Sequence, residues 1–104
     1  MRTSRVPPPP VQVRIPGLLR SYTDGAERIA IDVPAPVGAD PPPLAEGLAV
    51  LDARFPGLRF RIIDEQGRIR PHIKLFVDGV QARDTGAALP AGAELMIVGA
   101  LSGG

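Results

Sequence analysis

The sequence ends on Gly103-Gly104, and glycine has no side-chain chemistry, so the reactive group at this end is the terminal carboxylate. A carboxylate becomes an electrophile only after one of its oxygens has been made into a good leaving group. An apolar run, Leu95–Val98, lies shortly before and predicts a final β-strand. Glycine lacks a Cβ and reaches unusual backbone angles, so the last two positions carry no side chain that could obstruct a narrow site. Gly99 is a candidate hinge where this tail leaves the sheet.

Side-chain chemistry is sparse elsewhere. The chain has 0 cysteines, which excludes disulfides, iron–sulfur clusters, thiolate zinc sites and cysteine nucleophiles. His72 is the single histidine and has no nucleophile beside it, so we predict a solvated strand-edge residue and no metal site. Asp64-Glu65 and Asp84 adjoin glycine-containing turns, which favours solvated loop charges over an acid–base pair.

The composition is typical of a single globular domain. The chain has 104 residues and a formal net charge of +1, which indicates neither a nucleic-acid partner nor a membrane partner. A basic run is expected to be a solvated face, with RNA binding a poor second and an acidic partner surface a further alternative: Arg54, Arg59, Arg61, Arg68, Arg70 and Lys74. The N-terminus lacks the apolar segment of a signal peptide, and no apolar stretch approaches the roughly 20 residues that span a bilayer. We therefore expect a cytoplasmic protein.

The first half of the chain predicts a hairpin and a helix. Residues 1–10 form a Pro-rich leader that we expect to be disordered or extended. Apolar and polar residues alternate over Val11–Ile15 and Glu27–Val33, which predicts two strands joined by a long connection. After a Pro-rich loop, an apolar stripe of helical period follows Pro43 and stops at Pro56-Gly57: Leu44, Leu48, Leu51 and Phe55.

The second half predicts four further strands: Leu58–Ile63, His72–Val77, Val80–Ala82 and Glu94–Val98. If Leu75 faces the core, Phe76 faces outward beside Met96, and the two could form an apolar patch that docks a partner. Two alternatives are that Phe76 is covered by other parts of the chain and that the register is shifted by one residue. The fold class is α+β, a mixed sheet of about five strands packed on one main helix.

The strand order, the segment HIKLFVDGVQARDTGAALPAGAELMIVGALSGG at 72–104 and the Gly-Gly end together resemble the MoaD/ThiS family of sulfur-carrier proteins. These are relatives of ubiquitin with the β-grasp fold. The resemblance covers residues 11–104 and is most specific over the last third. It implies a β-grasp domain over 11–98 and a flexible tail over 99–104, and it leaves out the Pro-rich leader over 1–10.

The resemblance also implies a chemistry. A ubiquitin-activating-type enzyme uses ATP to adenylate the Gly104 carboxylate, with Leu101, Ser102 and Gly103 threading its active site. A sulfide or persulfide source, which a sulfurtransferase could supply, then replaces the adenylate and leaves a thiocarboxylate. This sulfur passes to an enzyme of cysteine, molybdopterin or thio-metabolite synthesis. The carrier itself binds no cofactor or metal, is a co-substrate rather than an enzyme, and is monomeric when free.

Two other functions remain open from the sequence. The same activated carboxylate could be joined to lysines of target proteins, as in a ubiquitin-like modifier. Alternatively, the domain could be an interaction module that happens to end on glycines. A ferredoxin-type β-grasp is excluded, because its cluster needs four cysteines.

Overall fold

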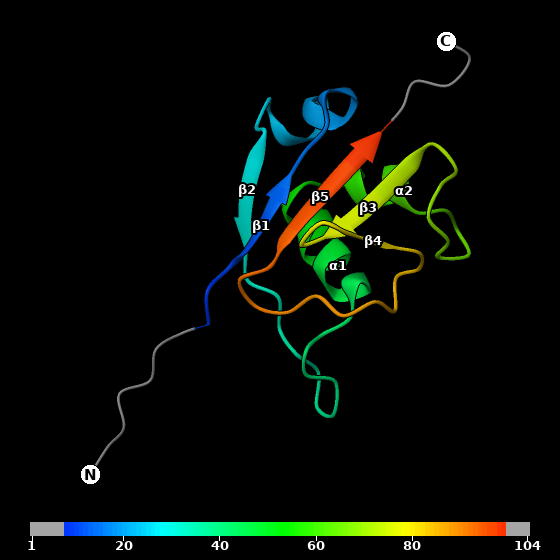
Figure 1. Ribbon diagram of the computed structural model, residues 1–104. Helices are drawn as coiled ribbons and strands as arrows, with labels where there is room; N and C mark the ends of the chain where they lie inside the picture. The colour runs from blue at the N-terminus through cyan, green and yellow to red at the C-terminus, as the bar shows by residue number, and fades with distance from the viewer. Residues whose placement is uncertain (1–7, 100–104) are drawn as a thin grey trace.

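The computed structural model describes residues 8–99 (Figure 1). In chain order the elements are β1 (Val11–Arg14), the 3-10 helix η1 (Gly17–Thr23), β2 (Arg28–Ile31), α1 (Leu44–Arg54), α2 (Leu58–Ile62), β3 (Ile73–Val77), β4 (Val80–Ala82) and β5 (Glu94–Gly99). The predicted hairpin, main helix and last three strands are all present within a residue or two of their expected bounds. The α+β class is therefore confirmed.

The five strands form one mixed sheet in the order β2-β1-β5-β3-β4. The central strand, β5, runs parallel to β1, and every other neighbouring pair is antiparallel. Figure 1 shows both α-helices on one side of this sheet. The parallel pairing of β1 with β5 places the start of β1 and the end of β5 at opposite ends of the sheet.

Helix α1 supplies the centre of the core. Leu44, Leu48 and Leu51 are each 0% exposed, as their helical spacing predicts. Pro43 precedes the helix and has no side-chain donor or acceptor to cap it, so the long loop before β5 takes this role. The Leu44 N–H donates to the Ala87 carbonyl at 2.7 Å. This loop therefore holds the start of α1 against the body of the domain.

Gly47 lies inside α1, where glycine costs about 1 kcal/mol relative to alanine. Its backbone is buried, and a Cβ at this position would lie 2.5 Å from Cδ2 of Leu89. Leu89 is itself 0% exposed, so its side chain cannot swing into solvent. The glycine therefore lets the loop before β5 pack directly on the helix.

The predicted strand over Leu58–Ile63 is wrong, because residues Leu58–Ile62 form helix α2. The run LRFRI alternates, but Leu58 and Ile62 also lie four residues apart, and these two are 0% exposed. Asp52 selects the helix: its Oδ1 accepts the backbone N–H groups of Gly57 and Arg59 at 3.1 and 3.2 Å. A carboxylate at this point satisfies N–H groups that a helix start leaves without partners.

The connection between β1 and β2 contains η1, which the sequence analysis treated only as a link. Leu19 and Thr23 anchor it, each 2% exposed. The Thr23 hydroxyl lies 3.0 Å from the Ala26 carbonyl and 3.3 Å from that of Arg20, so this buried polar group has an acceptor for its proton. Helix η1 thus covers the end of the sheet at which β5 finishes.

Candidate functional site

The tail residues predicted to carry the chemistry, Leu101, Ser102, Gly103 and Gly104, lie outside the described residues. The structure defines their point of departure, because β5 ends at Gly99. Gly99 pairs with Ile73 of β3, so the strand is held by the sheet up to its last residue. The tail therefore begins at a fixed place, beside η1.

Gly99 is required there by close packing. A Cβ on this residue would lie 2.4 Å from Cδ2 of Leu18 and 3.4 Å from Cδ1 of Ile73. Leu18, on η1, thus rests directly on the backbone of the last strand. The sequence favours a hinge at Gly99, and in the structure this residue is the position that admits Leu18. No sequence signal pointed to this contact.

The outward face of the sheet carries one row of side chains that crosses all five strands. The Cα pairings place its members opposite one another in the order Arg28, Arg14, Met96, Phe76 and Gln81. Met96 and Phe76 are direct partners at the centre, and both are partly exposed. The predicted outward position of this pair is confirmed, and the one-residue shift in register is excluded.

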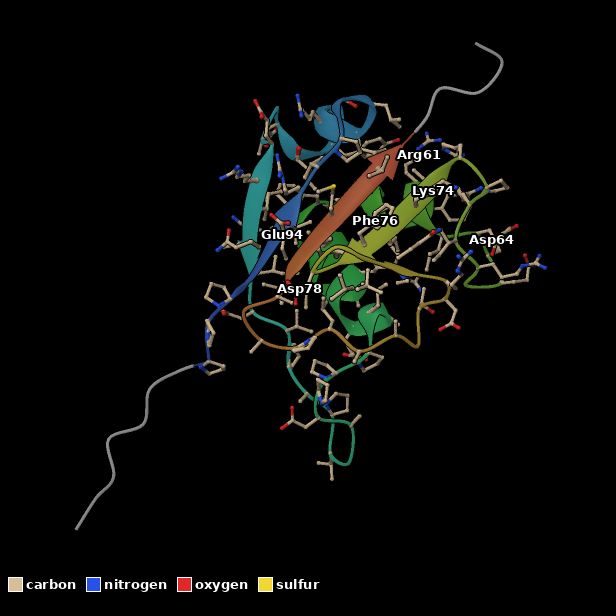
Figure 2. The ribbon with its side chains drawn as sticks, in the orientation of Figure 1. Arg61, Asp64, Lys74, Phe76, Asp78 and Glu94 are labelled. Atoms are coloured by element: carbon tan, nitrogen blue, oxygen red, sulfur yellow. The ribbon has the colours of Figure 1, made fainter. Side chains whose placement is uncertain are left out.

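The burial pattern agrees with this orientation. On β3, Ile73 and Leu75 are 3% and 0% exposed, whereas Lys74 is exposed. Lys74 pairs with Val98, which extends the outward face toward the tail. At the opposite end, Asp78 Oδ1 accepts the backbone N–H of Glu94 at 2.9 Å. Figure 2 shows Phe76 between Lys74 on the tail side and Asp78 at the far end.

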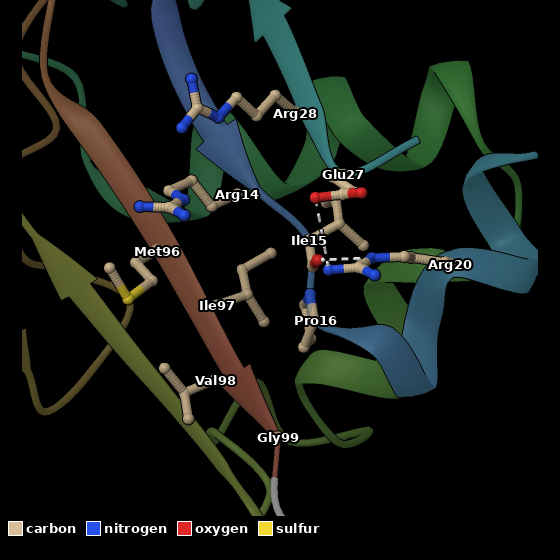
Figure 3. Close-up of a pocket in the computed structure, with 10 residues that line it drawn as sticks. All are labelled: Arg14, Ile15, Pro16, Arg20, Glu27, Arg28, Met96, Ile97, Val98 and Gly99. Carbon is tan, nitrogen blue, oxygen red and sulfur yellow. Dashed lines mark hydrogen bonds and ion pairs between the residues drawn. The ribbon is translucent and has the colours of Figure 1, made fainter. Parts of the chain in front are cut away.

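A cavity of about 300 Å³ opens beside this face, between β5 and the turn that follows β1 (Figure 3). Its lining is Arg14, Ile15, Pro16, Arg20, Glu27, Arg28, Met96, Ile97, Val98 and Gly99. Arg20 Nε donates to the Ile15 carbonyl at 3.1 Å, and its guanidinium lies 3.9 Å from Glu27. The cavity thus joins three arginines, one glutamate and an apolar wall at the root of the tail.

The arginines of this cavity are only weakly neutralised within the chain. Arg14 lies 4.0 Å from Glu94, and both side chains are 46% exposed, a geometry that contributes well under about 1 kcal/mol. Among residues 8–99, Arg28 makes no ion pair. Strand alternation places Arg14 on the outer face, but only the strand pairing brings Arg28 beside it, so the sequence analysis missed this pair.

The acidic residues singled out in the sequence, Asp64 and Asp84, accept hydrogen bonds within turns. Asp64 organises a turn: its Oδ1 accepts the backbone N–H groups of Gln66 and Arg68, each at 2.9 Å. The pKa of Asp64 lies below its ordinary value of 3.8, chiefly because the Arg68 backbone N–H donates to the carboxylate. Burial acts in the opposite direction and raises the pKa, whereas the Gln66 N–H and the Arg68 charge lower it further. Asp84 likewise accepts the Gly86 N–H at 2.8 Å. Both carboxylates lie in turns, as predicted, and each also accepts backbone hydrogen bonds there, which the prediction of solvated loop charges did not include.

His72 precedes β3 and is half-buried against the cavity wall formed with η1 and α2. Within residues 8–99, no group of three or more His, Asp or Glu side chains is placed to hold a metal ion. In the same part of the chain, no helix has the length and apolar character needed to cross a membrane.

The sequence matches no protein-family model and no curated protein. Solved structures nevertheless share the fold. The chain superposes on a chain of the Amycolatopsis orientalis BexX/CysO complex with a TM-score of 0.74 and 24% identity, covering 90% of this chain and 99% of the other.

Two further structures agree. Mycobacterium tuberculosis CysO gives a TM-score of 0.73 at 22% identity, covering 88% of this chain and 99% of that one. SAMP1 from Haloferax volcanii, a small archaeal modifier protein, gives 0.72 at 24% identity, covering 90% and 98%. At these identities the likeness establishes the fold, which is the ubiquitin-like β-grasp that the resemblance implied.

Proposed function

We propose that this chain is a sulfur carrier whose Gly104 carboxylate is adenylated and converted to a thiocarboxylate. The observation that supports this function most strongly is the junction at Gly99: the central strand of a β-grasp is held to its last residue and leads into a sequence ending in Gly-Gly. Five residues can extend about 17 Å beyond the sheet. That reach is enough to carry a carboxylate into a partner's active site while the body docks outside.

The proposed reaction uses two co-substrates, ATP and a source of reduced sulfur. The Gly104 carboxylate attacks the α-phosphorus of ATP, which forms the acyl-adenylate and releases pyrophosphate. Hydrosulfide then attacks the acyl carbon, the bond from that carbon to the AMP oxygen breaks, and a thiocarboxylate, AMP and a proton are formed. If the donor is a persulfide, a thiol must reduce the resulting acyl disulfide. None of these steps needs a side chain of the carrier.

In this proposal, the outward face of the sheet is the surface that binds the partner enzymes. Met96 and Phe76 would contact a ubiquitin-activating-type adenylating enzyme, and the same face would serve a sulfur-accepting biosynthetic enzyme in turn. The complex of CysO with BexX is a case in which a chain of this fold has a protein partner. Since ATP and reduced sulfur are both available in the cytoplasm, we place the proposed cycle there.

A ubiquitin-like modifier is the second candidate, favoured by the likeness to a protein named as a small archaeal modifier. In that function the activated Gly104 acyl group is transferred to a lysine amine of a target, which forms an isopeptide bond and releases AMP or a thiol. The fold and the activation step are common to both functions. Only the fate of the activated carboxylate separates them.

The test is intact mass before and after alkylation at mildly acidic pH, on the chain from its native host and after incubation with ATP, the adenylating enzyme and sulfide. Because the chain has 0 cysteines, a terminal thiocarboxylate is the one thiol-like group that alkylation can find, and mapping the label to Gly104 separates it from alkylation of the two methionines. We expect alkylation that maps to Gly104. Removal of Gly103-Gly104, or addition of one residue after them, should abolish it without changing the unfolding midpoint. An unmodified chain in both samples would reject the carrier, and isopeptide-linked targets would favour the modifier.

A further inference from the structure

A second cavity, of about 480 Å³, lies on the other side of the tail root, which is the end of β5 at Gly99. Its lining is Leu18, Leu19, Tyr22, Phe60, Arg61, Arg70 and His72, drawn from η1, α2 and the segment before β3. Leu18 forms part of its wall and also rests on Gly99. The cavity therefore adjoins the point at which the tail leaves the sheet. Figure 2 shows Arg61 at the same end of the molecule.

Hydrogen bonds and aromatic rings of the same chain hold two guanidinium groups of this cavity in place. Arg70 Nε donates to the Phe60 carbonyl at 2.7 Å, and its guanidinium lies 4.7 Å from the centre of the Phe60 ring. Arg61 Nε donates to the Tyr22 hydroxyl, and its guanidinium lies 5.5 Å from the centre of that ring. Each arginine thus uses its Nε–H and one face within the chain, which leaves the terminal N–H groups available to a ligand.

Among residues 8–99, the positive charge of the cavity has no counter-ion: no carboxylate of this range lines the cavity, and neither Arg61 nor Arg70 makes an ion pair within it. The cavity of Figure 3 differs in this respect, since Arg14 and Arg20 each lie within 4.0 Å of a glutamate. Two preoriented guanidinium groups without an acid are the geometry that binds a carboxylate or phosphate through paired hydrogen bonds.

Apolar side chains beside the two arginines determine which anions the cavity suits. Leu19 is 2% exposed, whereas Phe60 is 53% exposed, so apolar surface lies beside the charges. This arrangement suits an anion carried on a hydrocarbon stem. The proposed adenylation takes place at Gly104, five residues beyond Gly99. We therefore assign the cavity an occupant other than the nucleotide.

We propose that this cavity binds a glutamate or aspartate side chain within an apolar segment of the partner protein that receives the tail. The proposal rests on the proposed function in taking the partner to be a protein that the tail enters. Together with the arginines of Figure 3, the cavity makes the rim of the tail root basic. The mouth of the partner's tail channel is accordingly acidic.

The test is an NMR titration of the full 15N-labelled chain with an acetylated, amidated hexapeptide of alternating Glu and Leu, and with the matched Gln–Leu peptide. We expect the Glu–Leu peptide to shift the signals of Leu18, Tyr22, Arg61, Arg70 and His72. Its affinity should fall several-fold between about 0.02 and 0.2 M salt, because a carboxylate–guanidinium pair at the surface is screened. Equal binding of the Gln–Leu peptide, or no shift with either peptide, overturns the proposal.

Variants and other anions complete the test. Arg61→Gln should weaken Glu–Leu binding by about tenfold, the loss of one charge-assisted hydrogen-bond pair. Arg59→Gln removes the same charge from an exposed position of α2 outside the cavity and should leave binding unchanged. Equal losses in the two variants would mean a general charge effect. Tighter binding of inorganic phosphate or of a single-stranded oligouridylate at the same signals would also reject the partner-protein assignment.

The readout is independent of sulfur chemistry. A chain lacking Gly103-Gly104 should bind the Glu–Leu peptide as well as the full chain does. Failure of thiocarboxylate formation with peptide binding intact would reject the proposed function alone. Normal thiocarboxylate formation with no peptide binding would reject the cavity assignment alone.

Discussion

Gly47 and Gly99 are required by close packing, since a Cβ on either would lie within 2.5 Å of a leucine side chain. At Gly99 the space that a Cβ would need is occupied by Leu18, whose Cδ2 lies 2.4 Å from that point. The last residue of β5 is thereby bonded to the sheet on one side and covered by η1 on the other. The side chain of a residue within η1 therefore helps to fix where the tail begins.

Gly99→Ala should lower the free energy of unfolding by about 0.5–2 kcal/mol. Overpacking costs about 1–3 kcal/mol, and replacing glycine in a strand returns about 0.5–1 kcal/mol. Denaturant unfolding of a double-mutant cycle with Leu18→Ala measures the coupling. In the Leu18→Ala background the same change should be neutral or stabilising. A loss of equal size in both backgrounds would show that Leu18 is not the cause.

Asp64 should make stability depend on pH in the acidic range. Its pKa is lowered in the folded chain, chiefly by the Arg68 backbone N–H, so the ionised carboxylate stabilises the fold above the ordinary pKa of 3.8. That contribution is lost as pH falls through the lower folded pKa. The stability difference between the parent and Asp64→Asn, from urea unfolding at pH 2–7, should be constant near neutrality and shrink below about pH 3.8. Glu65→Gln, at an exposed neighbour, is the control; a pH-independent difference for Asp64→Asn would contradict this account.

At the scale of elements, the outward row of the sheet is exposed without being needed for the core. Met96 and Phe76 pair at its centre and are partly exposed, while the alternate residues of the same strands, Leu95 and Leu75, are 0% exposed. The two faces of β3 and β5 therefore separate the side chains that build the core from those assigned to docking in the proposed function. Substitutions on the outward face can change partner binding while the domain stays folded.

Phe76→Ser and Met96→Ser should each raise the KM of the adenylating enzyme for the carrier by about tenfold, the cost of losing one anchoring side chain at an interface. The rate at saturating carrier should stay nearly unchanged, since neither residue touches the tail chemistry. Val80→Ser, at a side chain of edge strand β4 that is 71% exposed, is the matched control. Unaltered KM values in both test variants would place the docking surface elsewhere.

Local sequence patterns predicted most of the elements, and their failures have physical causes. Alternation over Val11–Ile15 defined β1 correctly because its inward residues are fully buried. The pattern at Leu58–Ile62 satisfied both a strand and a helix, and the choice depends on hydrogen bonds from Asp52, which lies on another element. The tail root combines Leu18, Gly99 and Arg61, which are distant in sequence, so no local pattern could reveal it.

At the scale of the whole molecule, the two ends of the described chain have different neighbours. Pro9 accepts the Gly92 N–H at 3.0 Å and lies close to that residue, beside the start of β5. The end of β5, by contrast, lies between the two arginine-lined cavities. Charge and apolar surface are therefore concentrated where the proposed partner must approach.

A folded domain fused ahead of Met1 through a flexible linker should leave thiocarboxylate formation within about twofold of the parent rate. The reason is the parallel pairing of β1 with β5, which separates the start of β1 from Gly99 by the length of a strand, roughly 17–20 Å. The same domain fused after Gly104 should abolish the reaction, since no free carboxylate remains there. The alkylation assay with ATP, the adenylating enzyme and sulfide measures both fusions. If the N-terminal fusion also blocked the reaction while remaining folded, the partner would have to contact the start of β1, and the outward face near Gly99 could not be the whole docking surface.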